Sequence, residues 1–387
     1  MDYIDRLSKV SHKNPAYSKR FSHDILTLLL KSCTCDKNIV VSPARLQAVM
    51  VLIANWAEVS MRNKILAKIG SGLLTLEDAN ILSSKRLVDL TIVDWLKDST
   101  ETDNLPTIEQ QAILWIQNGL QVNESSLKKS AEDFAVSLRH VDFNNPELKS
   151  AMDKAISDAT HGLIKQLDLQ ITQDTKAILA DILYFKAKWD NTFDENDTRN
   201  QVFYGMREKQ NVPMMKMAET LAYYENEIVQ VVKLPYTCIA KEKTSFSMRI
   251  YLPKPKHDIT DISQSTLVCN LQSTEVKLSL PRFSVESSIN MKQLIEDLGM
   301  SFIFSSQDII PECVKNLQIQ QVIQQTKVSI DENGTEAAAV TSVDCILGCC
   351  PMEKSRPKIM MVNRPFMFEI TEDASDTILF AGVINNL

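Results

Sequence analysis

The sequence has few glycines and no segment that would divide it into separate parts. Only 9 glycines occur in 387 residues, and no run rich in proline, glycine or serine, no block of like charge and no repeat interrupts the chain. Length alone favours two or three domains. Because linkers are missing, one large domain that buries about three quarters of its unfolded surface is the simpler interpretation. We therefore predict a single domain over residues 1–387.

Sequence motifs for catalysis and metal binding are also missing. There is no G-x-S-x-G motif, phosphate loop, H-E-x-x-H motif or dinucleotide fingerprint. The 5 histidines are scattered, and even the best placed, His140 and His161, suit a structural role better than a catalytic one. The spacing of the 8 cysteines fits no zinc ribbon or finger. We predict that the protein is not an enzyme and that it holds no metal and no cofactor.

The net charge of the whole chain and the hydropathy of its N-terminus exclude further classes of protein. A formal net charge of −7 disfavours nucleic acid as a partner. The first 20 residues lack the apolar core of a secretory signal, and the apolar run at 25–30 is too short to span a bilayer. If Met1 is the native start, we expect a cytoplasmic protein, with the nucleus as an alternative, reduced cysteines and no membrane association.

The periodicity of apolar residues changes along the chain from helical to alternating. Helical spacing over residues 44–69 and 146–167 predicts two helices, the first preceded by Ser42 and a proline. Beyond Lys176, alternation predicts strands at 246–252 and 276–280, and a pair of strands at 366–370 and 378–380. A short helix is expected at 291–298. Helices early and strands late indicate the α+β class.

Residues 329–345 form the most informative segment. Read as a strand, the segment has two different faces. One face is uncharged and consists of small or β-branched residues: Thr335, Ala337, Ala339, Thr341, Val343 and Cys345. The opposite face carries both charges, Glu336 and Asp344, so this peptide can enter a sheet with its small face inward. Composition alone favours a plainer interpretation, an edge strand or short helix followed by a surface loop.

Residues 331–339 resemble the hinge of inhibitory serpins, and other blocks resemble the same family in the same order. These blocks are residues 38–43, the helix with Thr160, Gly162 and Ile164, residues 184–189, 212–215, 280–283, 298–300, 363–370 and 378–382. Each block alone is a weak signal, whereas the ordered set covers nearly the whole chain and is specific.

The resemblance implies a fold and a mechanism. The implied fold is α+β, with three β-sheets, about eight or nine helices and an exposed reactive loop at about residues 332–362. The implied mechanism is suicide inhibition by a metastable monomer. A protease attacks the loop and forms an acyl-enzyme, and the cut loop then enters the main sheet as a new strand. The alternative is a non-inhibitory serpin that acts as a binding or scaffold protein.

The resemblance also assigns residues to the hinge and the cleaved bond. The hinge residues are Glu332, Gly334, Thr335, Glu336, Ala337, Ala338 and Ala339. Counting from Gly334 places the bond between Gly348 and Cys349, after Leu347. Counting back from Pro365 places it at Lys354–Ser355. The first count is preferred, since the sheet fixes the length of the inserted strand and a loop tolerates extra residues.

Each position of the bond implies a different target protease. With Leu347 one residue before the bonded glycine, a papain-like cysteine protease is favoured. A bond at Leu347–Gly348 would suit a chymotrypsin-like serine protease, and a bond after Lys354 a trypsin-like one.

Three positions depart from the pattern that holds the main sheet of serpins shut. Arg45 stands for the second serine after Ser42-Pro43, Asp181 for an asparagine and Gln324 for a histidine. An arginine and an acid that appear together predict a charge-assisted pair. Trp189 matches the tryptophan where insertion begins, whereas Ala155 replaces a larger anchor in a helix.

Overall fold

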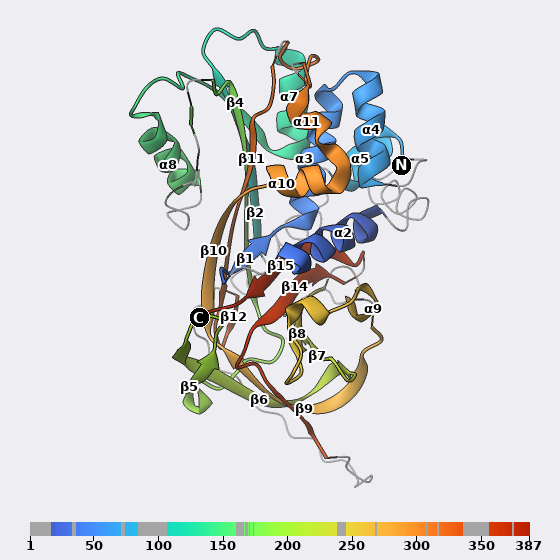
Figure 1. Cartoon of the computed structure of the whole chain (residues 1–387), viewed down its shortest axis with the longest axis vertical. Helices are drawn as coiled ribbons and strands as arrows, with labels where there is room; N and C mark the ends of the chain where they lie inside the picture. The colour runs from blue at the N-terminus through green and yellow to red at the C-terminus, as the bar shows by residue number, and fades with distance from the viewer. Residues whose placement is uncertain are drawn as a thin grey trace, which may run out of the picture.

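The computed structural model describes most of the chain. The described residues are 17–32, 36–70, 74–83, 107–159, 166, 169, 171–172, 174–237, 245–267, 269–306, 308–315, 317–335, 356–373 and 375–387. They form two large sheets and a set of helices, arranged in an elongated molecule (Figure 1).

The six-stranded sheet runs through the upper half of the molecule (Figure 1). Its spatial order is β10 (Phe283–Asn290), β11 (Gln321–Ile330), β12 (Gly334–Thr335), β4 (Ala177–Lys188), β2 (Thr107–Gln117) and β3 (Val136–Val141). Strand β4 is buried from Ala177 to Phe185 without a break, because helices cover both faces of its first part and strands of the second sheet pack on Leu183 and Phe185. One face packs on α8 (Leu148–Ala159) and the other on α3 (Pro43–Trp56) (Figure 1).

The nine-stranded sheet forms the opposite end of the molecule. Its members are β1 (Ile39–Val41), β15 (Thr377–Ile384), β14 (Phe366–Glu372), β8 (Phe246–Pro253), β7 (Val229–Pro235), β6 (Lys209–Glu225), β9 (Gln272–Pro281), β13 (Lys358–Met361) and β5 (Arg199–Tyr204). Three sheets were implied, but the described residues form two. The 17-residue β6 joins strands into one sheet because it pairs with β5 over residues 209–214, with β9 over 214–223 and with β7 over 222–225.

Most helices cluster on one side of the six-stranded sheet (Figure 1). The remaining helices are α2 (Tyr17–Ser32), α4 (Val59–Ile69), α5 (Leu76–Ser83), α7 (Glu124–Phe134), α9 (Gln264–Leu267), α10 (Lys292–Ile295) and α11 (Phe302–Ser305). Short turns lie at η2 (Glu195–Asp197), η3 (Ile259–Asp261) and η4 (Glu296–Met300). Helix α3 starts with Ser42 as N-cap and Pro43 in the first turn, and it is buried almost all round.

The predicted elements are largely present, with three corrections. The strands predicted beyond Lys176 and the returning pair at the C-terminus are confirmed as β8, β9, β14 and β15. The helix predicted over 44–69 is two helices, because the chain is extended at Ala57 and Glu58. The helix predicted to begin at 146 begins at Leu148, and its end, with Thr160, Gly162 and Ile164, lies outside the described residues. Strands β2 and β3, which lie between the two segments predicted to be helical, were not predicted.

Candidate functional site: the hinge and the closed sheet

The hinge begins with a tight turn between β11 and β12. The amide of Asp331 donates to the carbonyl of Gly334 at 2.9 Å. The Asp331 carboxylate accepts from the amides of Asn333 at 2.9 Å and Gly334 at 3.1 Å. Ile330 then pairs with Thr335, and Gly334 and Thr335 pair with Lys188 and Ala187 of β4. The first residues of the predicted hinge therefore already form a short strand between β11 and β4.

Gly334 is required by this arrangement. Its φ is +152°, and a Cβ at this position would lie 2.1 Å from the carbonyl oxygen of Ala187. A side chain is thus excluded by the backbone of the neighbouring strand. The glycine lets the chain turn and enter the sheet at the same point.

Thr335 is fully buried and points inward. Its hydroxyl lies 2.8 Å from the hydroxyl of Tyr236. Tyr236 stacks on Trp189, with ring centroids 4.5 Å apart and planes 9° from parallel. Burial raises the pKa of Tyr236 far above its ordinary value, so this phenol stays protonated. The Trp189 Nε1–H donates to the carbonyl of Asp331 at 3.0 Å, which ties the aromatic pair to the turn.

Glu332 fixes the turn from the other side. Its side chain is 3% exposed and meets Arg282 at 2.5 Å, and the Thr198 hydroxyl donates to the same carboxylate at 2.6 Å. Burial raises the pKa of Glu332, but the bonds from Arg282 and Thr198 outweigh it and hold this pKa below its ordinary value. Glu332 is therefore a buried, ionised anchor of the hinge.

The middle of the sheet is closed by a buried polar cluster. Beyond Thr335, β11 and β4 pair directly in parallel, from Gln321 with Ile178 to Lys327 with Tyr184. On the face toward α3, Arg45 contacts the same Asp181 oxygen, Oδ1, through Nε at 2.9 Å and a terminal nitrogen at 2.5 Å. Both side chains are almost fully buried, at 6% and 1% exposure. The predicted pairing of Arg45 with Asp181 is thus present.

Gln324 of β11 completes this cluster in a way the sequence did not reveal. Its carbonyl oxygen accepts from the Ser42 amide at 2.6 Å, and its Nε2 donates to the Ser42 carbonyl at 3.0 Å. The same Nε2 lies 3.3 Å from the second oxygen of Asp181. The two strands on either side of the closed seam are therefore linked to each other and to the start of α3.

The predicted reactive bond lies outside the described residues. This holds for Leu347, Gly348, Cys349, Lys354 and Ser355. It holds equally for the hinge residues after Thr335, namely Glu336, Ala337, Ala338 and Ala339. At the two ends of the segment predicted as the reactive loop, about 332–362, residues 332–335 lie in the turn and in β12, and β13 pairs in parallel with β9.

The far end of the loop is anchored by charges that sequence reasoning missed. Glu225 accepts from Lys358 at 2.6 Å and pairs with Lys254 at 2.9 Å. These two lysines lower the pKa of Glu225 to about 2. The Gln230 side chain adds a bond to the carbonyl of Ile359 at 3.0 Å. No local pattern signals this anchor, since its members are far apart in the sequence.

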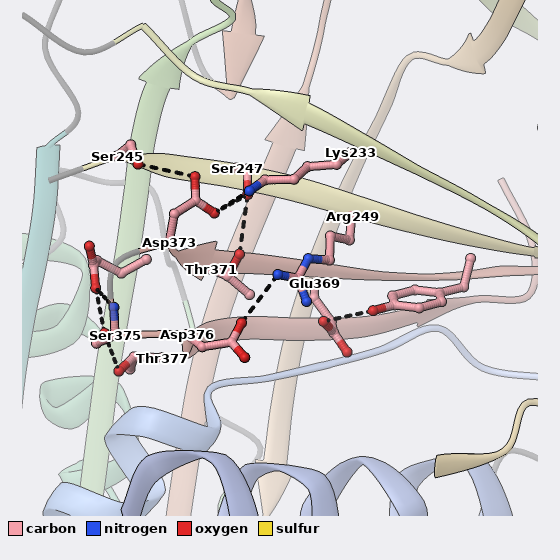
Figure 2. A network of polar contacts seen from close by, with 12 residues as sticks. Lys233, Ser245, Ser247, Arg249, Glu369, Thr371, Asp373, Ser375, Asp376 and Thr377 are labelled. Atoms are coloured by element: carbon pink, nitrogen blue, oxygen red, sulfur yellow. Dashed lines mark hydrogen bonds and ion pairs between the residues drawn. The ribbon is translucent and has the colours of Figure 1, made fainter. Parts of the chain in front are cut away.

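A second polar network lies in the nine-stranded sheet, away from the hinge (Figure 2). Asp373 accepts from the Ser247 hydroxyl at 2.6 Å and pairs with Lys233 at 2.9 Å. The Ser247 hydroxyl also lies 3.2 Å from that of Thr371. These bonds join β7 and β8 to the end of β14.

The same network continues into the buried part of the sheet (Figure 2). Arg249 pairs with Asp376 at 3.2 Å, and Tyr251 donates to Glu369 at 3.1 Å. Burial raises the pKa of Tyr251 well above its ordinary value. The network provides partners for the hydroxyls of Ser247 and Tyr251 inside the sheet, although the buried Nε of Arg249 makes no hydrogen bond among the described residues, and we assign it a structural role.

The described residues contain neither a candidate membrane-spanning helix nor a candidate metal-binding cluster. In the described part of the chain, no helix is long and apolar enough to cross a membrane. Within the same residues, no three His, Cys, Asp or Glu side chains are grouped so that they could hold a metal ion.

Comparisons with known proteins agree with this geometry. Residues 16–387 match the family described as "Serpin (serine protease inhibitor)". An uncharacterized serpin-like protein of Thermococcus kodakarensis is 31% identical over 70% of this chain and 65% of its own length. A serine protease inhibitor of Cyanea capillata is 29% identical over 91% of this chain and 93% of its own. The chain belongs to the serpin family.

A solved structure confirms the fold independently. Human thyroxine-binding globulin in complex with its hormone matches with a TM-score of 0.80 and 22% identity, over 98% of this chain and 99% of that one. The likeness shows a shared fold, and it comes from a protein whose described ligand is a small molecule.

Proposed function

We propose that this chain inhibits proteases as a suicide substrate, by loop cleavage and insertion of the cut loop between β11 and β4. The observation that carries this proposal is β12. Thr335 already pairs with both neighbouring strands, Gly334 pairs with β4, and Thr335 is fully buried. Insertion would extend a strand that exists rather than start a new one. The protein would then be an inhibitor and not an enzyme, with a protease as its partner.

Side-chain alternation supports continued insertion. Since Thr335 points inward toward Tyr236, a continuing strand would turn Ala337, Ala339 and Thr341 to the same side. Glu336 would point to the opposite face. The sequence beyond β12 is therefore compatible with a buried small face, as the mechanism requires.

The direct pairing of β11 with β4 defines what insertion must overcome. β11 and β4 have to separate from each other, starting at the pair Lys327–Tyr184 and continuing toward the pair Gln321–Ile178. The contact between Gln324 and Asp181 crosses this seam, whereas Arg45 holds Asp181 from the adjacent helix. We infer that Asp181 stays with Arg45 while Gln324 moves with β11.

The target class follows from the proposed bond. Cleavage at Gly348–Cys349 places Leu347 at the position that papain-like cysteine proteases read, and we propose such a target. A serine protease remains the alternative, through Leu347–Gly348 or Lys354–Ser355. We further propose that the protein acts as a monomer inside the cell, in the cytoplasm or the nucleus, where the cysteines beside the bond stay reduced.

The test is incubation with a panel of papain-like, chymotrypsin-like and trypsin-like proteases. We expect a covalent complex that survives SDS and a released C-terminal fragment beginning at Cys349. A complex with a fragment beginning at Ser355 would support inhibition but overturn the cysteine-protease target. Cleavage at every site without any stable complex would overturn inhibition itself.

The runner-up function is a non-inhibitory binding protein. The buried cluster at Arg45, Asp181 and Gln324 favours it, because the hydrogen bond from Gln324 to the charged Asp181 crosses the seam and resists the separation of β11 and β4. If this function is correct, the loop is a plain substrate, and cleavage does not stabilise the protein.

A further inference from the structure

Arg282, which bonds to Glu332 of the hinge turn, also lines a cavity. The cavity has a volume of about 490 Å³ and lies where the turn after β5, the start of β10 and the C-terminal segment meet. This is within the range of roughly 300–1,000 Å³ typical of small-molecule sites. The hydrogen bond from the Arg207 amide to the Asn386 side chain at 2.9 Å helps to form one wall.

Two guanidinium groups line this cavity. Within the described residues, Arg282 makes its side-chain bond to Glu332 through one terminal nitrogen and is 46% exposed. Arg207 pairs with Asp36 through Nε and is 59% exposed. Both arginines therefore retain donors that can reach the cavity, and a guanidinium can bind a planar carboxylate through two parallel hydrogen bonds.

The rest of the wall limits the ligand. Val212 and Phe283 line the cavity and are otherwise buried, so they offer a small apolar surface. Glu208 is the one acidic side chain among the described lining residues, and it already accepts from Gln210 at 3.2 Å. A single carboxylate attached to an apolar group fits this lining better than a multiply charged anion.

We propose that this cavity binds a small organic carboxylate and that binding weakens the bond between Arg282 and Glu332, which anchors the hinge turn. A ligand carboxylate on the remaining donors of Arg282 would share the charge of this guanidinium with Glu332, whose side chain is 3% exposed and also accepts from the Thr198 hydroxyl. A buried carboxylate that shares its counter-charge is less well stabilised. The turn at 331–334 would then hold β12 less firmly. Binding of the ligand does not depend on the proposed function, whereas its consequence for inhibition rests on that function.

Coupling of this kind is reciprocal. If the ligand weakens the bond between Arg282 and Glu332, removal of that bond must strengthen binding of the ligand. Glu332→Gln keeps the shape of the side chain and removes the competing charge. The variant is therefore expected to bind the ligand more tightly, a result that general damage to the hinge would not produce.

The experiment is calorimetric titration of the intact, uncleaved protein with phenylacetate, and with uncharged phenylacetamide as the matched control ligand. We expect phenylacetate to bind and phenylacetamide not to bind. Arg282→Gln and Arg207→Gln should each weaken binding about tenfold or more. Glu332→Gln should tighten it several-fold. Lys209→Gln removes a positive charge from β6 next to the lining residue Gln210, but Lys209 itself does not line the cavity, so binding of phenylacetate should be unchanged. Thermal unfolding of each variant checks that it is folded.

Three results would overturn the proposal. They are equal binding of phenylacetamide, an equal loss with Lys209→Gln, and unchanged or weaker binding with Glu332→Gln. In the wild-type protein, phenylacetate should also alter the fluorescence of Trp189, which contacts the turn. If the protein forms protease complexes and phenylacetate does not change their yield, the coupling is wrong and the proposed function stands. If the protein binds phenylacetate but forms no protease complex, the proposed function is wrong and the binding site stands.

Discussion

The two ends of one seam between β11 and β4 are built differently. At the hinge end the strands are already parted, and β12 lies between them. At the middle they pair directly, over a cluster of buried charge and amide. The hinge end depends on one glycine, one inward threonine and an anchored turn, whereas the middle depends on groups that must separate. If the cut loop inserts as proposed, the structure favours insertion at the hinge end and opposes it at the middle.

The difference locates the resistance. Extending β12 needs small side chains, which the sequence supplies, and it needs Gln324 to leave Asp181. Because an arginine holds Asp181 from α3, the charge on Asp181 is still compensated when the strands part. The cluster is expected to slow insertion without preventing it.

The largest effect is expected at the open end of the seam. Thr335→Arg should abolish complex formation and convert the protein into a substrate, because an unpaired charge would be buried beside Tyr236 at several kcal/mol. Thr335→Val is the matched control, which removes only the hydroxyl contact and should retain inhibition. The measurement is the yield of SDS-resistant complex. Complex formation by the arginine variant at the wild-type rate would show that the inward face is wrongly assigned.

The next effect is expected at the closed middle. Asp181→Ala leaves Arg45 buried without its partner and should lower the free energy of unfolding by roughly 3–5 kcal/mol. The double change Arg45→Ser with Asp181→Asn should recover much of that loss. Urea denaturation measures both. A loss of only about 0.5 kcal/mol, as at surface positions, would contradict the buried pair.

A smaller effect is expected from the anchor of the turn. Glu332→Gln should lower stability by roughly 1.5–3 kcal/mol, since it replaces charged hydrogen bonds with neutral ones. The pKa of Glu332 is below its ordinary value, so its contribution is present above the unfolded-state pKa and is lost as pH falls through the folded one. The stability difference between wild type and variant should therefore shrink in acid. A constant difference at all pH values would show that the ion pair is not responsible.

The smallest effect is expected at the far end of the loop. The pKa of Glu225 is lowered from 4.5 to about 2, so its stabilisation of β13 is complete above about 4.5 and is lost as pH falls toward about 2. The protection of the Ile359 and Met360 amides against hydrogen exchange, measured relative to the intrinsic exchange rate at each pH, should fall within that window in the wild type. In Glu225→Gln this protection should be low at every pH. Wild-type protection that does not change across the window would disprove the anchor.

The sequence predicted local features better than it predicted contacts between distant residues. Alternation identified β8, β9, β14 and β15, and the ordered family motifs identified the fold. Arg45 and Asp181 were paired correctly because two departures of opposite charge occur together. By contrast, β2 was missed because Glu109, Gln110 and Gln111 interrupt its apolar alternation.

Contacts that depend on how strands meet had no local signal. Gln324 bonds to Ser42, which is 282 residues away, and Arg282 bonds to Glu332 across 50. The presence of β12 between its neighbours follows from the register at Ala187 and Lys188, which no local pattern fixes. Periodicity reports which face of an element is buried, but it cannot report the neighbour that face will meet.

The most direct test of the account is the thermal stability of the protein before and after one clean cut within residues 336–355. If the cut loop enters the seam and extends β12, the midpoint of unfolding should rise sharply, because a strand is added to the six-stranded sheet. The same cut in Thr335→Arg should give no rise. An unchanged midpoint in the cleaved wild type would contradict insertion and favour the non-inhibitory function.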